Sequence, residues 1–132
     1  NSIGPILFEK HAIKYMANKY GANGDKIINI SSARLMNILI MLVHKVLSIL
    51  YTIGLALELA DDDILVNCVR PGFIDTNIHT LSGNPNCVEW LKDKLPLKRA
   101  GDPEEVVSAV IWLLSDGDDF TTGSFIDVTG GK

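Results

Sequence analysis

Three short segments that combine hydroxyl, proline and glycine residues each follow an apolar, strand-like run. They are Ser31-Ser32, Arg70-Pro71-Gly72 and Thr129-Gly130-Gly131. In an open parallel sheet, ligands bind beyond the carboxyl ends of the strands. Hydroxyl groups and closely approachable backbone at these three places therefore predict a ligand site at one edge of a sheet.

A lysine, Lys45, lies in the long apolar stretch Leu35–Ala60, which predicts a buried helix carrying the chemistry. Taken alone, each candidate has a structural explanation. Ser32 suits a strand-end cap, Asn1 a helix cap, and Lys45 a side chain whose ammonium reaches water along an apolar stem. Pro71-Gly72 suits any turn. Only the order and spacing of these residues favour a functional role.

Strands and helices alternate along the chain. The apolar spacing of Ile3–Tyr20 predicts a helix that Gly21–Asp25 ends. Short β-branched runs predict strands buried on both faces. These runs are Lys26–Ile30, Ile64–Val69 and Ser124–Val128. Asp102–Glu105 predicts the start of a helix that continues to Leu114, because an N-cap, a proline and two acids occur together.

This order predicts an α/β fold, with right-handed crossovers and a parallel sheet covered on both faces. The 132 residues suit a single domain. Pro71-Gly72 is expected to break the chain sharply. Residues 73–100 are polar and irregular, with at most a short helix at Val88–Leu95 capped by Asn86, and they suit a substrate loop.

Composition excludes several classes of partner. The formal charge of -4 leaves no basic face for nucleic acid or an acidic membrane. Cys68 and Cys87 suit a reducing compartment and resemble neither a disulfide nor metal ligands. With no signal-peptide pattern in view, we expect a cytoplasmic protein. Ile38–Leu57 is long enough to span a bilayer, but His44 and Lys45 near its centre make insertion costly.

Seven segments occur in the order and spacing of one known family. They are Asn1 at the head of a helix, Ile28–Ser32, Leu55–Ala60, Val66–Gly72, Asp75-Thr76, Asp102–Val106 and Thr122–Gly131. Together they resemble the C-terminal half of the short-chain dehydrogenase/reductase family. The tail is most similar to its sugar-dehydrogenase-like subgroup. The resemblance implies a Rossmann-like doubly wound sheet and hydride transfer between NAD or NADP and a carbonyl or alcohol.

The resemblance also implies roles for single residues. Ser32 would hydrogen-bond the substrate oxygen, and Asn1 would hold a proton-relay water. Lys45 would bind the nicotinamide ribose and lower the pKa of a catalytic tyrosine from about 10 toward the working pH. The nicotinamide side would be lined by Pro71, Gly72, Ile74 and Thr76. Ile74 would offer backbone groups to the carboxamide.

Two features depart from the family pattern. The Gly-rich phosphate loop and the residue that selects NAD or NADP should precede Asn1, so we interpret residues 1–132 as the C-terminal part of a longer protein. The catalytic tyrosine should lie four residues before Lys45, where Met41 stands. Tyr15–Lys19 has the right spacing in the wrong helix. Tyr51 lies roughly 240° around the helix from Lys45.

The genetic code suggests an explanation for Met41. Met36–Tyr51 can be encoded by codons which, read one base earlier, give Asn-Glu-Tyr-Ile-Asp-Tyr-Ala-Ser-Ser-Gln-Gly-Ala-Ile-Asp-Thr-Leu. This resembles the family's Tyr-Ala-Ser-Ser-Lys-Gly-Ala segment, with the second tyrosine at position 41 and only the lysine codon, at position 45, one base wrong so that it reads glutamine. A shifted frame over about Arg34 or Leu35 to Tyr51 would also explain why Ser32 and Met41 are nine residues apart rather than about a dozen.

Three hypotheses follow. The first is an NAD(P)-dependent oxidoreductase acting on a small-molecule substrate. The second is a catalytically inactive remnant with a structural or interaction role, and the third is a membrane-associated protein using Ile38–Leu57. By resemblance, the protein would form a homodimer or homotetramer, for which an apolar helix face including Val46 and Ile53 is suited, as it is for core burial.

Overall fold

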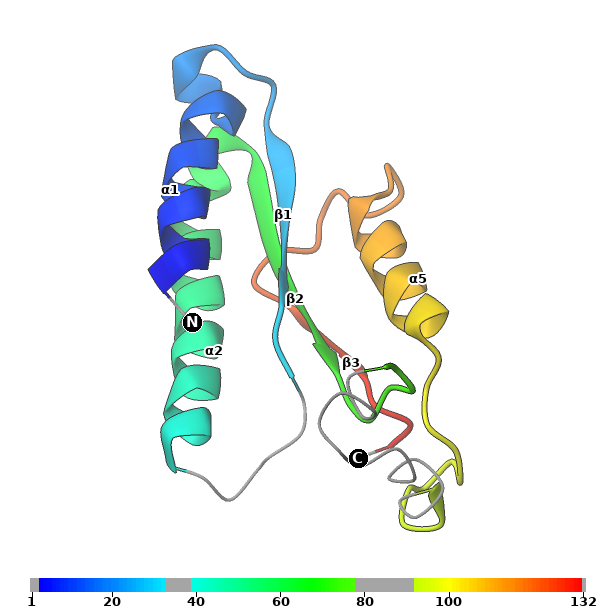
Figure 1. Cartoon of the computed structure of the whole chain (residues 1–132). Coiled ribbons are helices and arrows are strands. Elements are labelled where there is room, and N and C mark those ends of the chain that lie inside the picture. The colour runs from blue at the N-terminus through cyan, green and yellow to red at the C-terminus, as the bar shows by residue number, and fades with distance from the viewer. Residues whose placement is uncertain (1–2, 33–38, 78–91, 132) are drawn as a thin grey trace.

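A parallel three-stranded sheet carries helices on both faces, as the sequence predicts (Figure 1). The computed structural model describes residues 3–32, 39–77 and 92–131. The strands are β1 (Asp25–Ile30), β2 (Ile64–Pro71) and β3 (Phe125–Val128), in the order β1-β2-β3. Helices α1 (Ile3–Met16) and α2 (Leu39–Leu59) lie on one side of the sheet, and α5 (Pro103–Leu114) lies on the other.

The first helix ends four residues earlier than predicted. Helix α1 stops at Met16, Ala17 is extended (φ -75°, ψ 135°), and a 3-10 turn covers Asn18–Tyr20. Ala17 is fully buried and belongs to the core cluster, so the extended residue lets the chain pack there before it turns. Gly21, at φ 90°, then closes the turn in a conformation that glycine adopts without strain.

Strand β2 is longer than predicted, and the expected break at Pro71 is wrong. The strand continues through Pro71, which pairs with Val128 of β3. Proline has no N–H to give to the ladder, but the next residue, Gly72, donates its N–H to the Val128 carbonyl at 2.9 Å. Pro71 can therefore end the strand without breaking the pairing.

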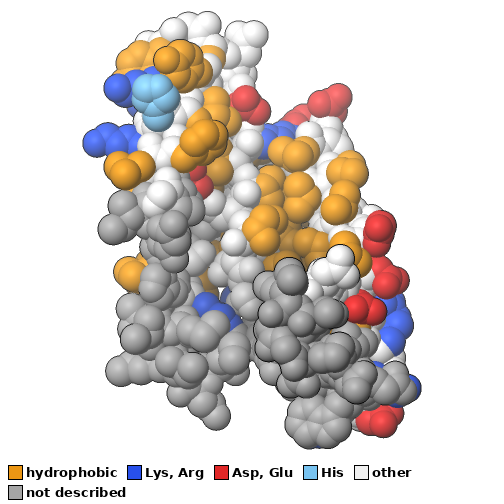
Figure 2. Space-filling view, viewed as in Figure 1, with side chains coloured by type: hydrophobic (Ala, Val, Ile, Leu, Met, Phe, Trp, Pro, Cys, Tyr) orange, Lys and Arg blue, Asp and Glu red, His pale blue; other side chains and the backbone are white. Residues whose placement is uncertain are grey.

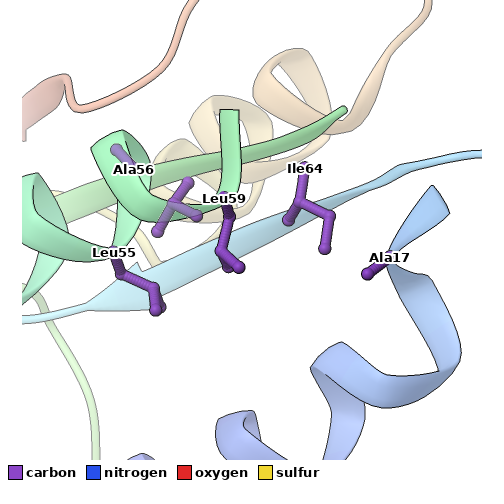
Figure 3. Close-up of a cluster of buried hydrophobic side chains, with 6 residues drawn as sticks. Ala17, Leu55, Ala56, Leu59 and Ile64 are labelled. Atoms are coloured by element: carbon purple, nitrogen blue, oxygen red, sulfur yellow. The ribbon is translucent and has the colours of Figure 1, made fainter. Parts of the chain in front are cut away.

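The main core lies between α2, β2 and the residue that follows α1 (Figure 3). Its labelled members are Ala17, Leu55, Ala56, Leu59 and Ile64. Leu55 and Leu59 are one helical turn apart, so both face the sheet from α2. Their burial fixes which face of α2 packs against the sheet. Polar side chains on the same helix face therefore also point toward the sheet.

One buried amide ties β2 to the segment before β3. Asn67 is 1 % exposed; its Nδ2 donates to the Thr121 carbonyl at 2.6 Å, and its Oδ1 accepts from the Ser124 N–H at 3.0 Å. Both polar ends of the side chain are therefore satisfied away from water, which a buried amide requires. The pair of bonds fixes where β3 begins.

Helix α5 begins and ends at defined contacts. The helix starts at the predicted N-cap Asp102, with Pro103 in the first turn, and Asp102 and Glu105 also form a capping box. At the other end, the Lys26 ammonium of β1 donates to the carbonyls of Ser115 (2.6 Å) and Asp118 (2.8 Å). A cation beside the carbonyls after the helix C-terminus also complements the helix dipole.

The described helices include none that is long and apolar enough to cross a membrane. Several large apolar side chains are nevertheless exposed. On α5 they are Val107, Ile111, Trp112 and Leu114, and Figure 2 shows apolar side chains gathered over this helix. On α2 they are Val46, Leu47, Leu50, Ile53 and Leu57. Core burial therefore does not explain Val46, which is 47 % exposed.

Candidate functional site

The three predicted ligand-binding segments meet at one edge of the sheet. The Ser31 N–H donates to the Val69 carbonyl at 2.9 Å, which places the end of β1 beside the end of β2. The Gly72 N–H reaches Val128 at the end of β3. Because all three strands are parallel, their carboxyl ends share this edge. Sequence and structure agree on where these segments lie.

Gly72 brings the ends of β2 and β3 into close contact. A Cβ atom at this position would lie 2.8 Å from Cα of Thr129, which is a backbone atom and cannot swing aside. Only glycine lets the two chains approach this closely without a shift of one strand. The backbones at the ends of β2 and β3 therefore lie in direct contact at this edge of the sheet.

The N-terminal end of α2 lies at the same end of the sheet as the carboxyl ends of the strands (Figure 1), and Lys45 is in the second turn of this helix. Thr52, seven residues and about two turns later, accepts a hydrogen bond from Asn29 of β1 (3.3 Å). Residues two turns apart share a helix face, so Lys45 lies on the face that contacts the sheet. The Lys45 ammonium nitrogen is accordingly shielded from solvent.

Ile74 is held from one side by Gly101, and the two residues form an isolated parallel bridge. The Gly101 N–H donates to the Phe73 carbonyl at 2.9 Å, and the Asp75 N–H donates to the Gly101 carbonyl at 2.8 Å. Since these bonds use the residues on either side of Ile74, its own N–H and C=O point away from Gly101. Such an orientation suits recognition of a ligand by backbone groups.

A bidentate ion pair lies next to this bridge, and sequence reasoning did not find it. Arg99 donates from Nη1 to Oε2 of Glu105 and from Nη2 to Oε1, both at 2.7 Å. This pair lowers the pKa of the Glu105 carboxyl to about 2. The pair and the bridge line one small depression with Phe73, Val128, Thr129 and Gly130. In the sequence, the only sign of this ion pair is that Arg99 stands six residues before Glu105, the acid that caps α5.

Not every predicted site residue can be placed. Asn1 lies outside the described residues, and so do Cys87 and the predicted helix cap Asn86. Position 41 lies in the first turn of α2, four residues before Lys45, but its side chain is outside the described part of the chain. Thr76 is exposed beyond the bridge at Ile74.

Burial raises the pKa of two further side chains, Cys68 and Tyr51. Burial raises the pKa of the Cys68 thiol, which lies inside β2 and is not paired in a disulfide. Burial, followed by a hydrogen bond to Glu9, raises the pKa of Tyr51. Its hydroxyl is directed at α1, so Tyr51 is not available as a proton donor at the strand ends.

The arrangement fits the nicotinamide end of a dinucleotide. The contact between the Gly72 and Thr129 backbones and the Ile74 backbone groups that point away from Gly101 suit a nicotinamide ring and its carboxamide substituent. The shielded Lys45 ammonium can donate to ribose hydroxyls. Within the described residues, no three His, Cys, Asp or Glu side chains gather as metal ligands.

Comparison with known proteins gives one consistent set of matches. A family model described as enoyl-(acyl carrier protein) reductase matches residues 1–132. An uncharacterized oxidoreductase of Escherichia coli (strain K12), YgfF, is 44 % identical over 137 residues, which cover 100 % of this chain and 56 % of that protein.

Two solved structures extend the comparison. The promiscuous reductase LugOII, which catalyses keto-reduction at C1 during lugdunomycin biosynthesis, superposes with a TM-score of 0.83 at 30 % identity, over 99 % of this chain and 51 % of its own. A blue fluorescent protein from a metagenomic library, solved in complex with NADPH, gives 0.68 at 29 % identity, over 80 % and 44 %. The chain spans about half the length of these relatives.

The Arg99–Glu105 pair makes stability depend on acid pH. The folded pKa of Glu105, about 2, lies below its ordinary 4.5, so the pair stabilises the folded chain above pH 4.5 and loses this effect as the pH falls toward 2. We expect Glu105→Gln to lower the free energy of unfolding at pH 7 and to match the parent near pH 2, in urea titrations. Glu104→Gln, in the same helical turn but facing solvent, is the control. A difference between Glu105→Gln and the parent that is independent of pH would contradict the shift.

Proposed function

This chain belongs to the short-chain dehydrogenase/reductase family, and we propose that it forms the C-terminal part of an NAD(P)-dependent oxidoreductase acting on a carbonyl or alcohol. The observation that carries the proposal is the convergence of Ser31-Ser32, Pro71–Ile74 and Thr129-Gly130 at one sheet edge. The NADPH-bound relative supports the cofactor class. The nicotinamide ring, when bound, supplies or accepts the hydride.

Three side chains of this chain act on the substrate oxygen and its proton, together with a tyrosine at position 41. Ser32, at the end of β1, donates a hydrogen bond to the oxygen and orients it. Lys45 holds the ribose hydroxyls, and its charge, shielded from solvent, lowers the pKa of a neighbouring tyrosine strongly because screening by water is reduced. Asn1 holds a water that returns the proton to solvent.

The nicotinamide side is built from backbone. Pro71 and Gly72 form the floor, and the N–H and C=O of Ile74 meet the carboxamide, while Thr76 adds a hydroxyl beyond them. This assignment is supported by the bridge that turns the Ile74 groups away from Gly101. The choice between NAD and NADP belongs to the N-terminal half of the protein. Residues 77–99 would shape the substrate pocket, and the sugar-dehydrogenase-like subgroup stays a prediction.

Position 41 decides whether the chain as written is an active enzyme. Methionine has no exchangeable proton, and Tyr51 is directed at Glu9. The chain as written therefore matches the second hypothesis, an inactive remnant. We propose instead that Met36–Tyr51 is read in a shifted frame and that the working protein has tyrosine at position 41, with one further base change turning the glutamine of the shifted frame at position 45 into lysine.

Burial along α2 supports the shifted frame. Val46, Leu47 and Leu50 are 47 %, 51 % and 62 % exposed. The shifted frame replaces them by glycine, alanine and threonine, which removes three large apolar side chains from solvent. It replaces Tyr51, which packs against the core, by leucine, which keeps the apolar contact and needs no partner for a hydroxyl. Four positions thus suit their surroundings better in the shifted frame.

The match to the Escherichia coli relative also involves a difference in length. It runs over 137 positions against the 132 residues of this chain, so the relative has residues that this chain lacks. The short spacing between Ser32 and Met41 is where the shifted frame predicts the shortage. The competing explanation is a subunit contact, since Ile53 and Leu57, beyond the segment, are also exposed.

Peptide sequencing by mass spectrometry tests the shifted frame. In protein made from its own gene, we expect peptides over positions 36–51 that contain tyrosine at position 41 and leucine in place of Tyr51. Peptides from β2 serve as the control, because they should match the printed sequence. Peptides that match Met36–Tyr51 as printed would end the shifted-frame proposal and favour the remnant.

Turnover measurements test the proposed function itself. With the chain joined to the N-terminal half of its own gene, we expect Met41→Tyr to raise NADPH- or NADH-dependent reduction of a panel of aldehydes, diketones and keto sugars by about two to four orders of magnitude, because it restores the proton donor. Adding Lys45→Met to that variant should remove the gain. Equal turnover with methionine and tyrosine at position 41 would contradict the assigned role.

A further inference from the structure

The ion pair between Arg99 and Glu105 is connected to Ile74 by hydrogen bonds that run through Ala100–Asp102. Glu105 Oε2 accepts from the Asp102 N–H at 2.8 Å as well as from Arg99. Arg99 Nη1 also donates to the Ala100 carbonyl at 3.0 Å. The residues on both sides of Gly101 are therefore held by the same two side chains.

Gly101 transmits this constraint to Ile74. Its N–H and C=O bond the residues on either side of Ile74, at 2.9 and 2.8 Å. A Cβ at Gly101 would lie 2.9 Å from Cδ1 of Ile74 and 3.4 Å from Oε2 of Glu105, so the side chains of Ile74 and Glu105 both pack directly against Gly101. A shift of Ala100–Asp102 would therefore move the backbone around Ile74.

Helix α5 supplies the rigid base. Glu105 lies in its first turn, and Asp102 is its N-cap. The far end of α5 is anchored separately, because the segment that follows it binds Lys26 of β1. The ion pair thus joins a fixed helix to the backbone that contacts the cofactor.

We propose that Arg99 and Glu105 are positioning residues for the nicotinamide, acting through Gly101 on the backbone of Ile74. The proposal rests on the proposed function, in which Ile74 meets the carboxamide. Removing the pair leaves the phosphate-binding half of the protein untouched. It therefore changes the alignment of the ring for hydride transfer more than the affinity for the dinucleotide.

The test compares Arg99→Met and Glu105→Gln in the joined protein with tyrosine at position 41. Glutamine keeps the helix cap but lacks the charge, so it isolates the ion pair from the capping box. We expect kcat to fall about tenfold or more, since small misplacements of reacting groups are costly. The Kd of NADPH, measured by fluorescence, should change less than about threefold, because the phosphate contacts remain. Arg99→Lys should rescue only partly, since lysine cannot donate in a bidentate fork.

Amide hydrogen exchange without nucleotide gives a second readout. Arg99→Met and Glu105→Gln should speed exchange at the Asp75 and Gly101 amides. Glu104→Gln, which removes an exposed carboxylate in the same helical turn, should leave both amides and kcat unchanged and serves as the matched control.

The outcomes separate two failures. Unchanged kcat in Arg99→Met, whether or not exchange at Asp75 accelerates, overturns the positioning role. A parallel loss of kcat and NADPH affinity, or an equal loss of kcat in Glu104→Gln, indicates an effect that is not specific to the ion pair and also overturns it. Absence of nicotinamide-dependent turnover in the joined protein with tyrosine at position 41 overturns the proposed function, and the positioning role falls with it, even where exchange shows that the ion pair holds Gly101.

Discussion

Strand β2 is hydrogen-bonded along both edges, and the geometry of the site depends on this double pairing. Its register with β1 brings Ile30 beside Val69, and its register with β3 brings Val128 beside Pro71. The bonds of Asn67 to Thr121 and Ser124 fix where β3 starts. A slip of either neighbour would separate the strand ends and reverse the facing of alternate side chains.

The site at these strand ends is formed largely by backbone. Gly72 is needed because the backbone at Thr129 approaches too closely for a Cβ, and Gly101 aligns the main chain around Ile74 through two backbone hydrogen bonds. Charged side chains reach this backbone from both sides of the sheet. Lys45 approaches from α2 on one side of the sheet, and Arg99 and Glu105 support the backbone from the α5 side. The two helix layers thus serve different purposes.

Much of this arrangement follows from local sequence patterns. β-Branched runs predict the strands, and the capping residues predict the start of α5 at Pro103, because both signals act over a few neighbouring residues. The pattern did not predict that α1 ends at Met16, because the burial of Ala17 is a tertiary contact. The continuation of β2 through Pro71 depends likewise on the pairing with β3.

The bridge between Ile74 and Gly101 could not be predicted, since it joins two ends of a long connection whose path depends on the whole fold.

Hydrogen exchange of the joined protein with and without NADP⁺ tests the proposed location of the cofactor. Protection should concentrate on peptides that cover 71–76 and 128–131. Saturating binding that protects the opposite edge of the sheet, at 21–25 and 61–63, and leaves 71–76 unchanged would contradict it.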